Sequence, residues 1–173
     1  MHPATATEPG IFRWDDLDLI AKRIAEIKSR CRWCVIVSHG GEEFTSLPSP
    51  YTRDRYLKFL ELGADVVVAH HPHVPENYEL FDNGKAIFYS LGNFIFDTDY
   101  QRVHLYTDVG VLLKLIFTEE AIDFERSGSG SSAETSGSIS PHFLPSSQTS
   151  RPRSMNFWHL SPQRPLSRRT AGK

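Results

Sequence analysis

The sequence predicts an α/β fold with a mixed sheet, followed by a disordered tail. Segments with helical spacing of apolar residues alternate with short runs of β-branched residues, which is the order of βαβ units. Later segments have the pattern of strands joined by tight turns. With 173 residues, 39% of them hydrophobic, the chain has room for one domain with a substantial core.

The first half of the chain predicts two helices and two buried strands. Residues 14–30 keep helical spacing, and aspartates load the first turn, where negative charge suits the helix dipole. The apolar run at 33–38 predicts a strand that ends at His39. Residues 49–63 predict the second helix, because Ser and Pro begin it and Gly ends it. Residues 65–69 predict the second strand.

The later elements predict strands that run in both directions. Residues 77–81 and 85–90 form two short strand patterns, and the Asp-Asn-Gly between them is a typical hairpin turn. Residues 109–117 and 121–125 predict further antiparallel strands. A βαβ unit followed by hairpins gives a mixed sheet.

Composition divides the chain at Arg126. Residues 1–125 hold 12 Lys and Arg against 20 Asp and Glu, whereas residues 126–173 hold 7 against 1 and include 13 serines and 5 prolines. The second segment has no helical or strand periodicity, so we expect a disordered basic tail after a domain at 1–125. Its aromatic residues are too sparse for a stacking platform, and no nucleic-acid partner is expected.

Two further sequence features argue against a membrane-spanning segment and against a redox-active cysteine pair. No apolar stretch approaches the roughly 18–20 residues of a spanning helix, and residues 1–10 lack the parts of a signal peptide. Cys31 and Cys34 have Cys-x-x-Cys spacing, but they fall between a helix and a strand. We therefore interpret them as ordinary reduced cysteines, not as a redox pair.

Histidines follow both predicted strands of the βαβ unit. His39 ends the first strand, and His70, His71 and His73 follow the second. A right-handed crossover brings both strand ends to the same edge of the sheet. If the extended backbone continues past Ala69, alternation points His71 and His73 to one side. The cluster predicts a metal site, and half-buried polar histidines remain the alternative.

Other polar residues near these strand ends are candidates for support of the site. Glu42 and Glu43 follow His39 on a glycine-rich loop, where they would orient ligands or contact substrate, or form a solvated acidic loop. Asn93 would donate to a substrate or hold the histidine loop, or satisfy backbone groups in a turn. His70 belongs to the same candidate set. No residue is assigned a catalytic role.

Four motifs resemble one known family. They are Ser-His-Gly-Gly-Glu-Glu at 38–43, Leu-Gly-Ala-Asp-Val-Val-Val at 62–68, His-His-Pro-His-Val at 70–74 and Tyr-Ser-Leu-Gly-Asn-Phe at 89–94. In this order and spacing they resemble the CapA family of poly-γ-glutamate capsule synthesis proteins, which is part of the calcineurin-like metallophosphatase superfamily. The resemblance covers about residues 30–125.

The resemblance implies a metallophosphatase-like α/β sandwich with a two-metal phosphoesterase-like site. The resemblance implies that His39, His71 and His73 are the metal ligands. Neutral imidazoles are suitable ligands for Mn, Fe or Zn. The resemblance also implies an anionic polymer or a phosphoester as substrate and a location in the cell envelope.

The chain departs from the family pattern in two ways that matter. Gly40 stands where many members have tryptophan, which would remove a wall of the pocket. No Gly-Asp or Asn-His dipeptide of the superfamily's early motifs occurs, so the chain resembles the C-terminal half of the domain. We expect an incomplete site without a bridging carboxylate, and an exposed sheet edge open to association. The alternative is an inactive binding or assembly module, or a truncated fragment.

Overall fold

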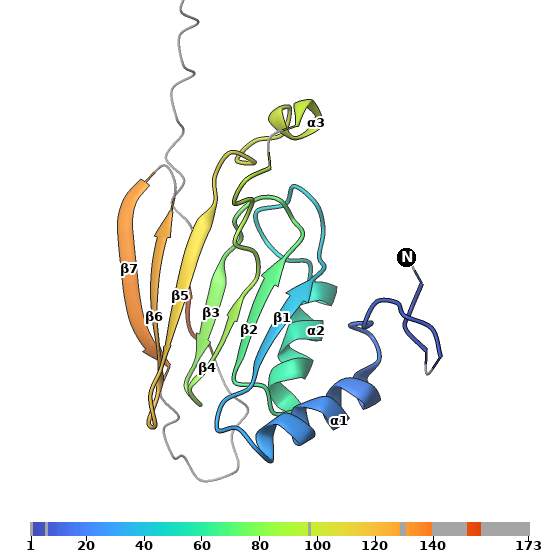
Figure 1. The fold of residues 1–173 in the computed structure, drawn as a ribbon. Coiled ribbons are helices and arrows are strands. Elements are labelled where there is room, and N and C mark those ends of the chain that lie inside the picture. Colours follow the sequence, from blue (N-terminus) through green and yellow to red (C-terminus); the bar gives the residue numbers. More distant parts are fainter. Residues whose placement is uncertain (1, 6, 97, 129–130, 140–151, 157–173) are drawn as a thin grey trace, which may run out of the picture.

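A computed structural model describes residues 2–5, 7–96, 98–128, 131–139 and 152–156, and it confirms the α/β class (Figure 1). The helices and strands, in chain order, are α1 Leu17–Lys28, β1 Val35–His39, α2 Pro50–Glu61, β2 Val66–His70, β3 Tyr78–Phe81, β4 Lys85–Phe88, α3 Asp99–Arg102, β5 Val111–Phe117, β6 Ile122–Gly128, β7 Ser131–Ile139 and β8 Pro152–Asn156.

The strands form two sheets. The larger sheet has the order β1-β2-β4-β3-β8, with β1, β2 and β4 parallel and β3 antiparallel to β4 and β8. The smaller sheet, β5-β6-β7, is antiparallel. The larger sheet is therefore mixed, as the sequence predicts.

Alternation along the central strand β2 separates two apolar layers. Val67 faces the layer with α1 and α2, where it packs in one cluster with Ile24, Tyr56 and Phe59. Val66 and Val68 face the smaller sheet, in a second cluster with Phe88, Ile122 and Phe124. Helices therefore cover one face of the larger sheet, and β5-β6-β7 covers the other (Figure 1).

The helix and turn signals of the sequence are present in the structure. The Ser49 side chain accepts a hydrogen bond from Thr52 N, and Pro50 begins α2. Gly63 follows the helix with φ of 117°, and a Cβ there would lie 3.2 Å from Cγ2 of Ile24. Glycine is needed at this position both for its backbone conformation and for the close approach of α1.

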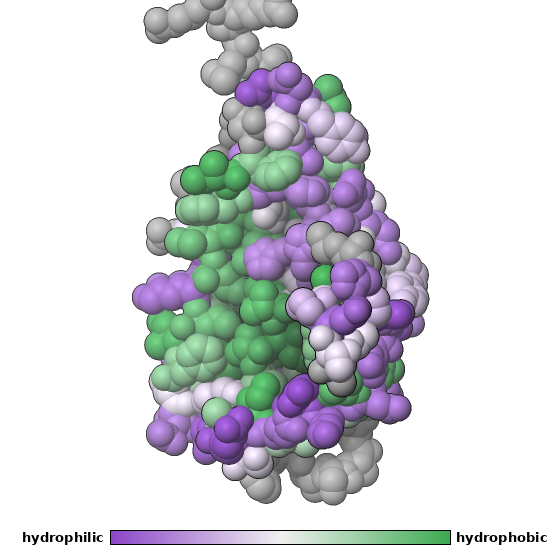
Figure 2. All heavy atoms as spheres, turned by 45° about the vertical axis from the view of Figure 1, so that its right-hand side comes forward, coloured by the Kyte–Doolittle hydropathy of each residue, from purple (hydrophilic) through white to green (hydrophobic). Residues whose placement is uncertain are grey.

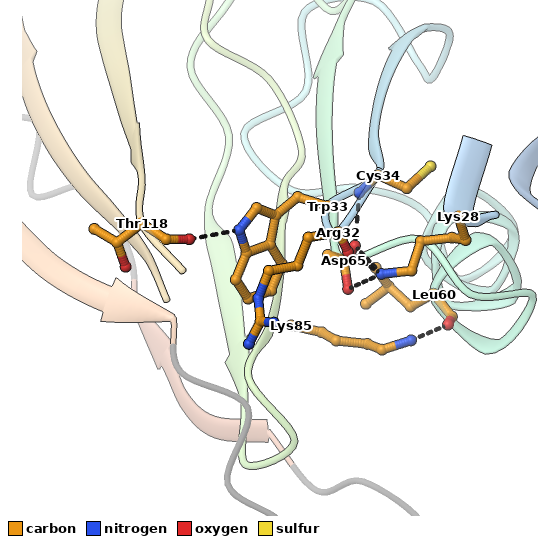
Figure 3. Close-up of polar contacts among 8 residues, drawn as sticks. All are labelled: Lys28, Arg32, Trp33, Cys34, Leu60, Asp65, Lys85 and Thr118. Atoms are coloured by element: carbon orange, nitrogen blue, oxygen red, sulfur yellow. Dashed lines mark hydrogen bonds and ion pairs between the residues drawn. The ribbon is translucent and has the colours of Figure 1, made fainter. Parts of the chain in front are cut away.

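A polar network fastens α1 to the beginnings of β1 and β2 (Figure 3). Lys28 Nζ lies 2.9 Å from an Asp65 carboxylate oxygen, which also accepts a 2.6 Å hydrogen bond from the Cys34 amide. Beside it, Trp33 Nε1 donates to the Thr118 carbonyl at 2.8 Å, which joins the two sheets. The amino ends of these strands are thus fixed by charge-assisted hydrogen bonds. Cys34 is buried and Cys31 is exposed, and both are free thiols.

Two tail segments differ from the sequence prediction of disorder. Residues 131–139 form β7 against β6, and residues 152–156 form β8 against β3. The serine-rich sequence has no apolar alternation there, so these strands are not predicted from it. Residues 129–130, 140–151 and 157–173 of the expected tail lie outside the described residues. In the described part of the chain, no helix has the length and apolar character needed to cross a membrane.

The β1 edge of the larger sheet carries exposed apolar residues. β1 is the terminal strand of that sheet, and Val37 on it is 72% exposed. A groove of about 680 Å³ runs along this edge, lined by α1, β1 and residues 11–15. Figure 2 shows hydrophobic residues gathered over a broad, hollowed area when this side of the molecule is turned forward.

Replacing Arg53 by Ala is expected to cost much more stability than replacing a surface arginine. Arg53 donates two hydrogen bonds, of 2.7 and 2.8 Å, to Glu79, whose side chain is fully buried. The variant leaves a buried carboxylate without its cation, so urea unfolding should show a loss of about 3–5 kcal/mol. Arg23→Ala breaks the exposed Arg23–Glu26 pair and should cost under about 1 kcal/mol. Equal losses would contradict this assignment.

The buried Glu76 carboxyl is expected to make the free energy of unfolding depend on pH. Burial raises the pKa of Glu76 from 4.5 to about 7. A hydrogen bond from the Thr45 hydroxyl acts in the opposite direction and lowers the pKa, but by less. The folded state therefore favours the protonated acid, and stability falls as pH rises from the unfolded-state pKa to about 7. Glu76→Gln should raise the free energy of unfolding at pH 8 and leave it nearly unchanged at pH 4. The same gain at both pH values would contradict the prediction.

Candidate metal centre

The parallel pairing of β1 and β2 brings the predicted histidines together. The register places His39 opposite His70, so both strands end at the same edge of the sheet. Beyond them, the Gly40 amide donates to the His70 carbonyl at 3.0 Å, and the Phe44 amide donates to the Pro72 carbonyl at 2.9 Å. The two loops that follow the strands are therefore bound to each other.

His71 and His73 reach the cluster by a different backbone route from the one predicted. β2 ends at His70, and φ is 114° at His71 and 65° at His73. The extended backbone continues past Ala69 only as far as His70, so strand alternation does not account for the positions of His71 and His73. The rings of His71 and His73 nevertheless lie 6.1 Å apart, and the positive φ angles mark strained residues of the kind found at functional sites.

His39 and His71 have the spacing of two ligands on one metal ion. His39 Nε2 and His71 Nδ1 are hydrogen-bonded to each other at 3.3 Å, with the ring planes inclined at 65°. Two nitrogens about 2.0–2.1 Å from a tetrahedral zinc ion would themselves be about 3.3 Å apart. His39 is exposed and His71 is partly exposed, so an ion could reach both nitrogens from solvent.

Asn93 determines which ring nitrogen of His73 donates a hydrogen bond. The Asn93 amide nitrogen donates to the Thr107 carbonyl at 3.0 Å, which turns Asn93 Oδ1 toward His73 Nδ1 at 2.8 Å. An amide oxygen only accepts, so His73 Nδ1 is the donor in this hydrogen bond, which leaves Nε2 as the nitrogen with the lone pair in a neutral ring. Metal-binding histidines are commonly oriented by such a hydrogen bond at the other ring nitrogen.

The surroundings of His39 and His70 favour their neutral imidazoles. Although His39 is exposed as a residue, partial desolvation of its ring, together with the neighbouring His71 and His73, lowers its pKa below the usual 6.5. Burial and His39 lower the pKa of His70 in the same direction. Neutral rings are the form that binds metal, so the local electrostatics suit ligation.

The structure places the remaining candidates in different positions. The Glu42 carboxylate accepts hydrogen bonds from Ser49 and Thr52 at the beginning of α2; partial burial opposes its ionisation, but the Ser49 and Thr52 bonds lower its pKa. Glu43 is exposed. Within the described residues, no group of three or more His, Cys, Asp or Glu side chains is arranged to hold a metal. The ready ligand set is therefore the His39–His71 pair, with His73 beside it.

The space that Gly40 leaves is covered by an indole from another part of the chain. A Cβ on Gly40 would lie 2.8 Å from the Trp14 ring. Trp14 also makes edge contacts with Tyr51 and Tyr56. Trp14 therefore occupies the space next to Gly40, a contact that no short motif could have indicated.

Sequence reasoning also missed two aromatic neighbours of His73. The ring centroids of Phe44 and Phe96 lie 5.8 and 5.1 Å from that of His73, and Phe44 also stacks on His104 at 3.7 Å with nearly parallel planes. Next to them, a cavity of about 490 Å³ is lined by residues that include Asn93, Phe96 and His104. His104 stands alone in the sequence, so neither spacing nor composition links it to the other histidines.

Comparison with known proteins finds relatives of the part of the chain that carries the histidine cluster. Residues 2–98 match the model of the family described as bacterial capsule synthesis protein PGA_cap. The chain is 38% identical over 99 residues to the PGA biosynthesis protein CapA of Bacillus subtilis (strain 168), a match over 57% of this chain and 26% of the relative. It is 36% identical over 103 residues to the capsule biosynthesis protein CapA of Bacillus anthracis, over 57% of this chain and 25% of the relative.

A more distant relative carries no functional name. The uncharacterized protein y4sH of Sinorhizobium fredii is 31% identical over 84 residues, which covers 47% of this chain and 18% of the relative. The aligned part spans about a quarter of the length of the Bacillus relatives. Because the family model matches more than half of its residues, the chain belongs to the bacterial capsule synthesis protein PGA_cap family.

Proposed function

We propose that this CapA-like capsule biosynthesis domain binds one divalent metal ion, of the Mn, Fe or Zn class, at His39, His71 and His73. The observation that carries the proposal is the 3.3 Å separation of His39 Nε2 and His71 Nδ1, the distance expected of two ligands on one ion. His73, oriented by Asn93, would add its Nε2 as a third donor when the ion binds.

The bound ion would serve a phosphoesterase-like centre that is incomplete in this chain. When bound, such an ion lowers the pKa of a water molecule and polarises a phosphoryl oxygen. The residues around it have separate tasks: the histidines hold the ion, Asn93 orients His73, and the cavity beside Asn93 and Phe96 has room for part of a substrate. Two cations would need a bridging carboxylate, and the Glu42 carboxylate is engaged by Ser49 and Thr52.

The proposed substrate class is supported by the names of the relatives and by the charge that a bound ion would bring. The Bacillus relatives are named for PGA and capsule biosynthesis, and we propose an anionic polymer or a phosphoester as the ligand of this domain. A metal ion beside neutral histidines supplies the positive charge that such a ligand needs.

A second candidate function is a catalytically inactive binding or assembly module. The observations that favour it are the exposed β1 edge with its apolar groove, and the lack of a ready three-ligand group in the described residues. An unpaired strand edge can add a strand from another chain. Two tightly bound metal ions per chain would indicate a complete two-metal enzyme and would exclude both candidates.

Titration with Co²⁺ or Zn²⁺ tests the metal proposal. We expect one ion per chain by calorimetry, and His71→Ala should weaken binding by about 10–100-fold because one of two paired ligands is lost. His2→Ala is the matched control: His2 Nε2 contacts the Pro9 carbonyl near the N-terminus, so its loss should leave the affinity unchanged.

Two results would contradict this reading. Equal affinities of the His71 and His2 variants would remove the histidine cluster as the site. Two tightly bound ions per chain, with turnover of an aryl phosphate, would show that the centre is complete.

Sedimentation velocity tests association through the β1 edge. We expect the sedimentation coefficient to rise with concentration, and Val37→Lys to suppress this rise, because a charge at a position that is 72% exposed discourages strand addition. Val103→Lys, at an equally exposed position away from β1, is the control. If both variants behave like the parent chain, the edge is not the associating surface.

A further inference from the structure

The short segment from α3 to Thr107 contacts His73 by two routes. The polar route runs through Asn93, whose amide nitrogen donates to the Thr107 carbonyl and lies 3.4 Å from Gln101 Oε1. The aromatic route runs through Phe44, which packs between His104 and His73. Two contacts from one segment therefore converge on a single imidazole.

The polar route is firmly anchored. Gln101 and Thr107 are 3% and 6% exposed, and Thr107 Oγ1 donates to the Gln101 carbonyl at 2.7 Å. The segment is closed on itself by this buried hydrogen bond. The hydrogen bond from His73 to Asn93 consequently has a fixed acceptor, although a single hydrogen bond does not stop a ring from rotating about it.

Aromatic contacts restrain the ring further: Phe96 lies 5.1 Å from His73 between ring centroids, and the aromatic route adds Phe44. The Phe44 ring lies 3.7 Å from the His104 ring with planes 3° apart, and 5.8 Å from His73 with planes 22° apart. These centroid distances and angles are those of a stacked series. Phe44 holds this position with φ of 60°, a conformation that phenylalanine rarely adopts, and its amide is bound to the Pro72 carbonyl.

We propose that Phe44 and His104 are positioning residues that set the ring plane of His73. The inference rests on the proposed function, because His73 is one of the three proposed ligands and the plane of its ring sets the direction of its Nε2. His104 acts through Phe44 and does not itself contact the ion. Its role is to keep Phe44 stacked, and through Phe44 to keep the hydrogen bond from His73 to Asn93 in line.

The test uses the metal-free protein. In long-range ¹H–¹⁵N spectra of the ¹⁵N-labelled chain, His73 of the parent should be mainly the Nδ1–H tautomer. We expect His104→Ala and Phe44→Leu to raise the Nε2–H form of His73 severalfold, because the ring can then turn away from Asn93. His104→Phe preserves the stack and should restore the parent tautomer. Leu105→Ala, in the same segment but at a side chain 80% exposed, is the control.

The outcomes separate this inference from the metal proposal. An unchanged His73 tautomer in both His104→Ala and Phe44→Leu overturns it, as does a His104→Phe variant that behaves like His104→Ala. A separate Co²⁺ titration should show about tenfold weaker binding for His104→Ala. If the parent binds no Co²⁺ while the tautomer shift is present, the metal proposal fails and the positioning role stands.

Discussion

The parallel register of β1 and β2 is the constraint on which the rest of this structure depends. It sets His39 opposite His70, and the loops beyond the two strands are then joined through the backbone by Gly40 and Phe44. Because the loops are bound to each other, the imidazoles of His39 and His71 meet at 3.3 Å even though the chain leaves the strand conformation after His70. A slip of the register by one residue would turn these side chains to opposite faces of the sheet.

The opposite ends of the same strands explain why the register holds. Asp65 binds both Lys28 and the Cys34 amide where the two strands begin, and the central strand packs in apolar layers on both faces. Arg53 and Tyr89 satisfy the buried carboxylate of Glu79 nearer the site. The strands are fixed at one end by charge and at the middle by packing, so their other ends can carry polar, partly exposed residues without loss of order.

Much of this fold follows from local sequence signals, and the fine geometry of the site does not. Some signals act within a few residues and can therefore be recognised in the sequence. They are the cap at Ser49, the glycine after α2 and the hairpin turn. The positive φ angles of His71 and His73 arise from contacts with a loop about 30 residues away. The Phe44–His104 stack and the cover of Gly40 by Trp14 join equally distant segments. The serine-rich sequence of β7 has no apolar alternation, so its pairing with β6 could not be predicted from local signals.

The central claim is that two strand ends present a pair of imidazoles at the spacing of metal ligands. Anomalous diffraction at the zinc edge, from crystals grown with Zn²⁺, tests it most directly. We predict one peak about 2.0–2.1 Å from both His39 Nε2 and His71 Nδ1. A peak elsewhere on the molecule, or none at all with these two rings turned apart, would contradict the account.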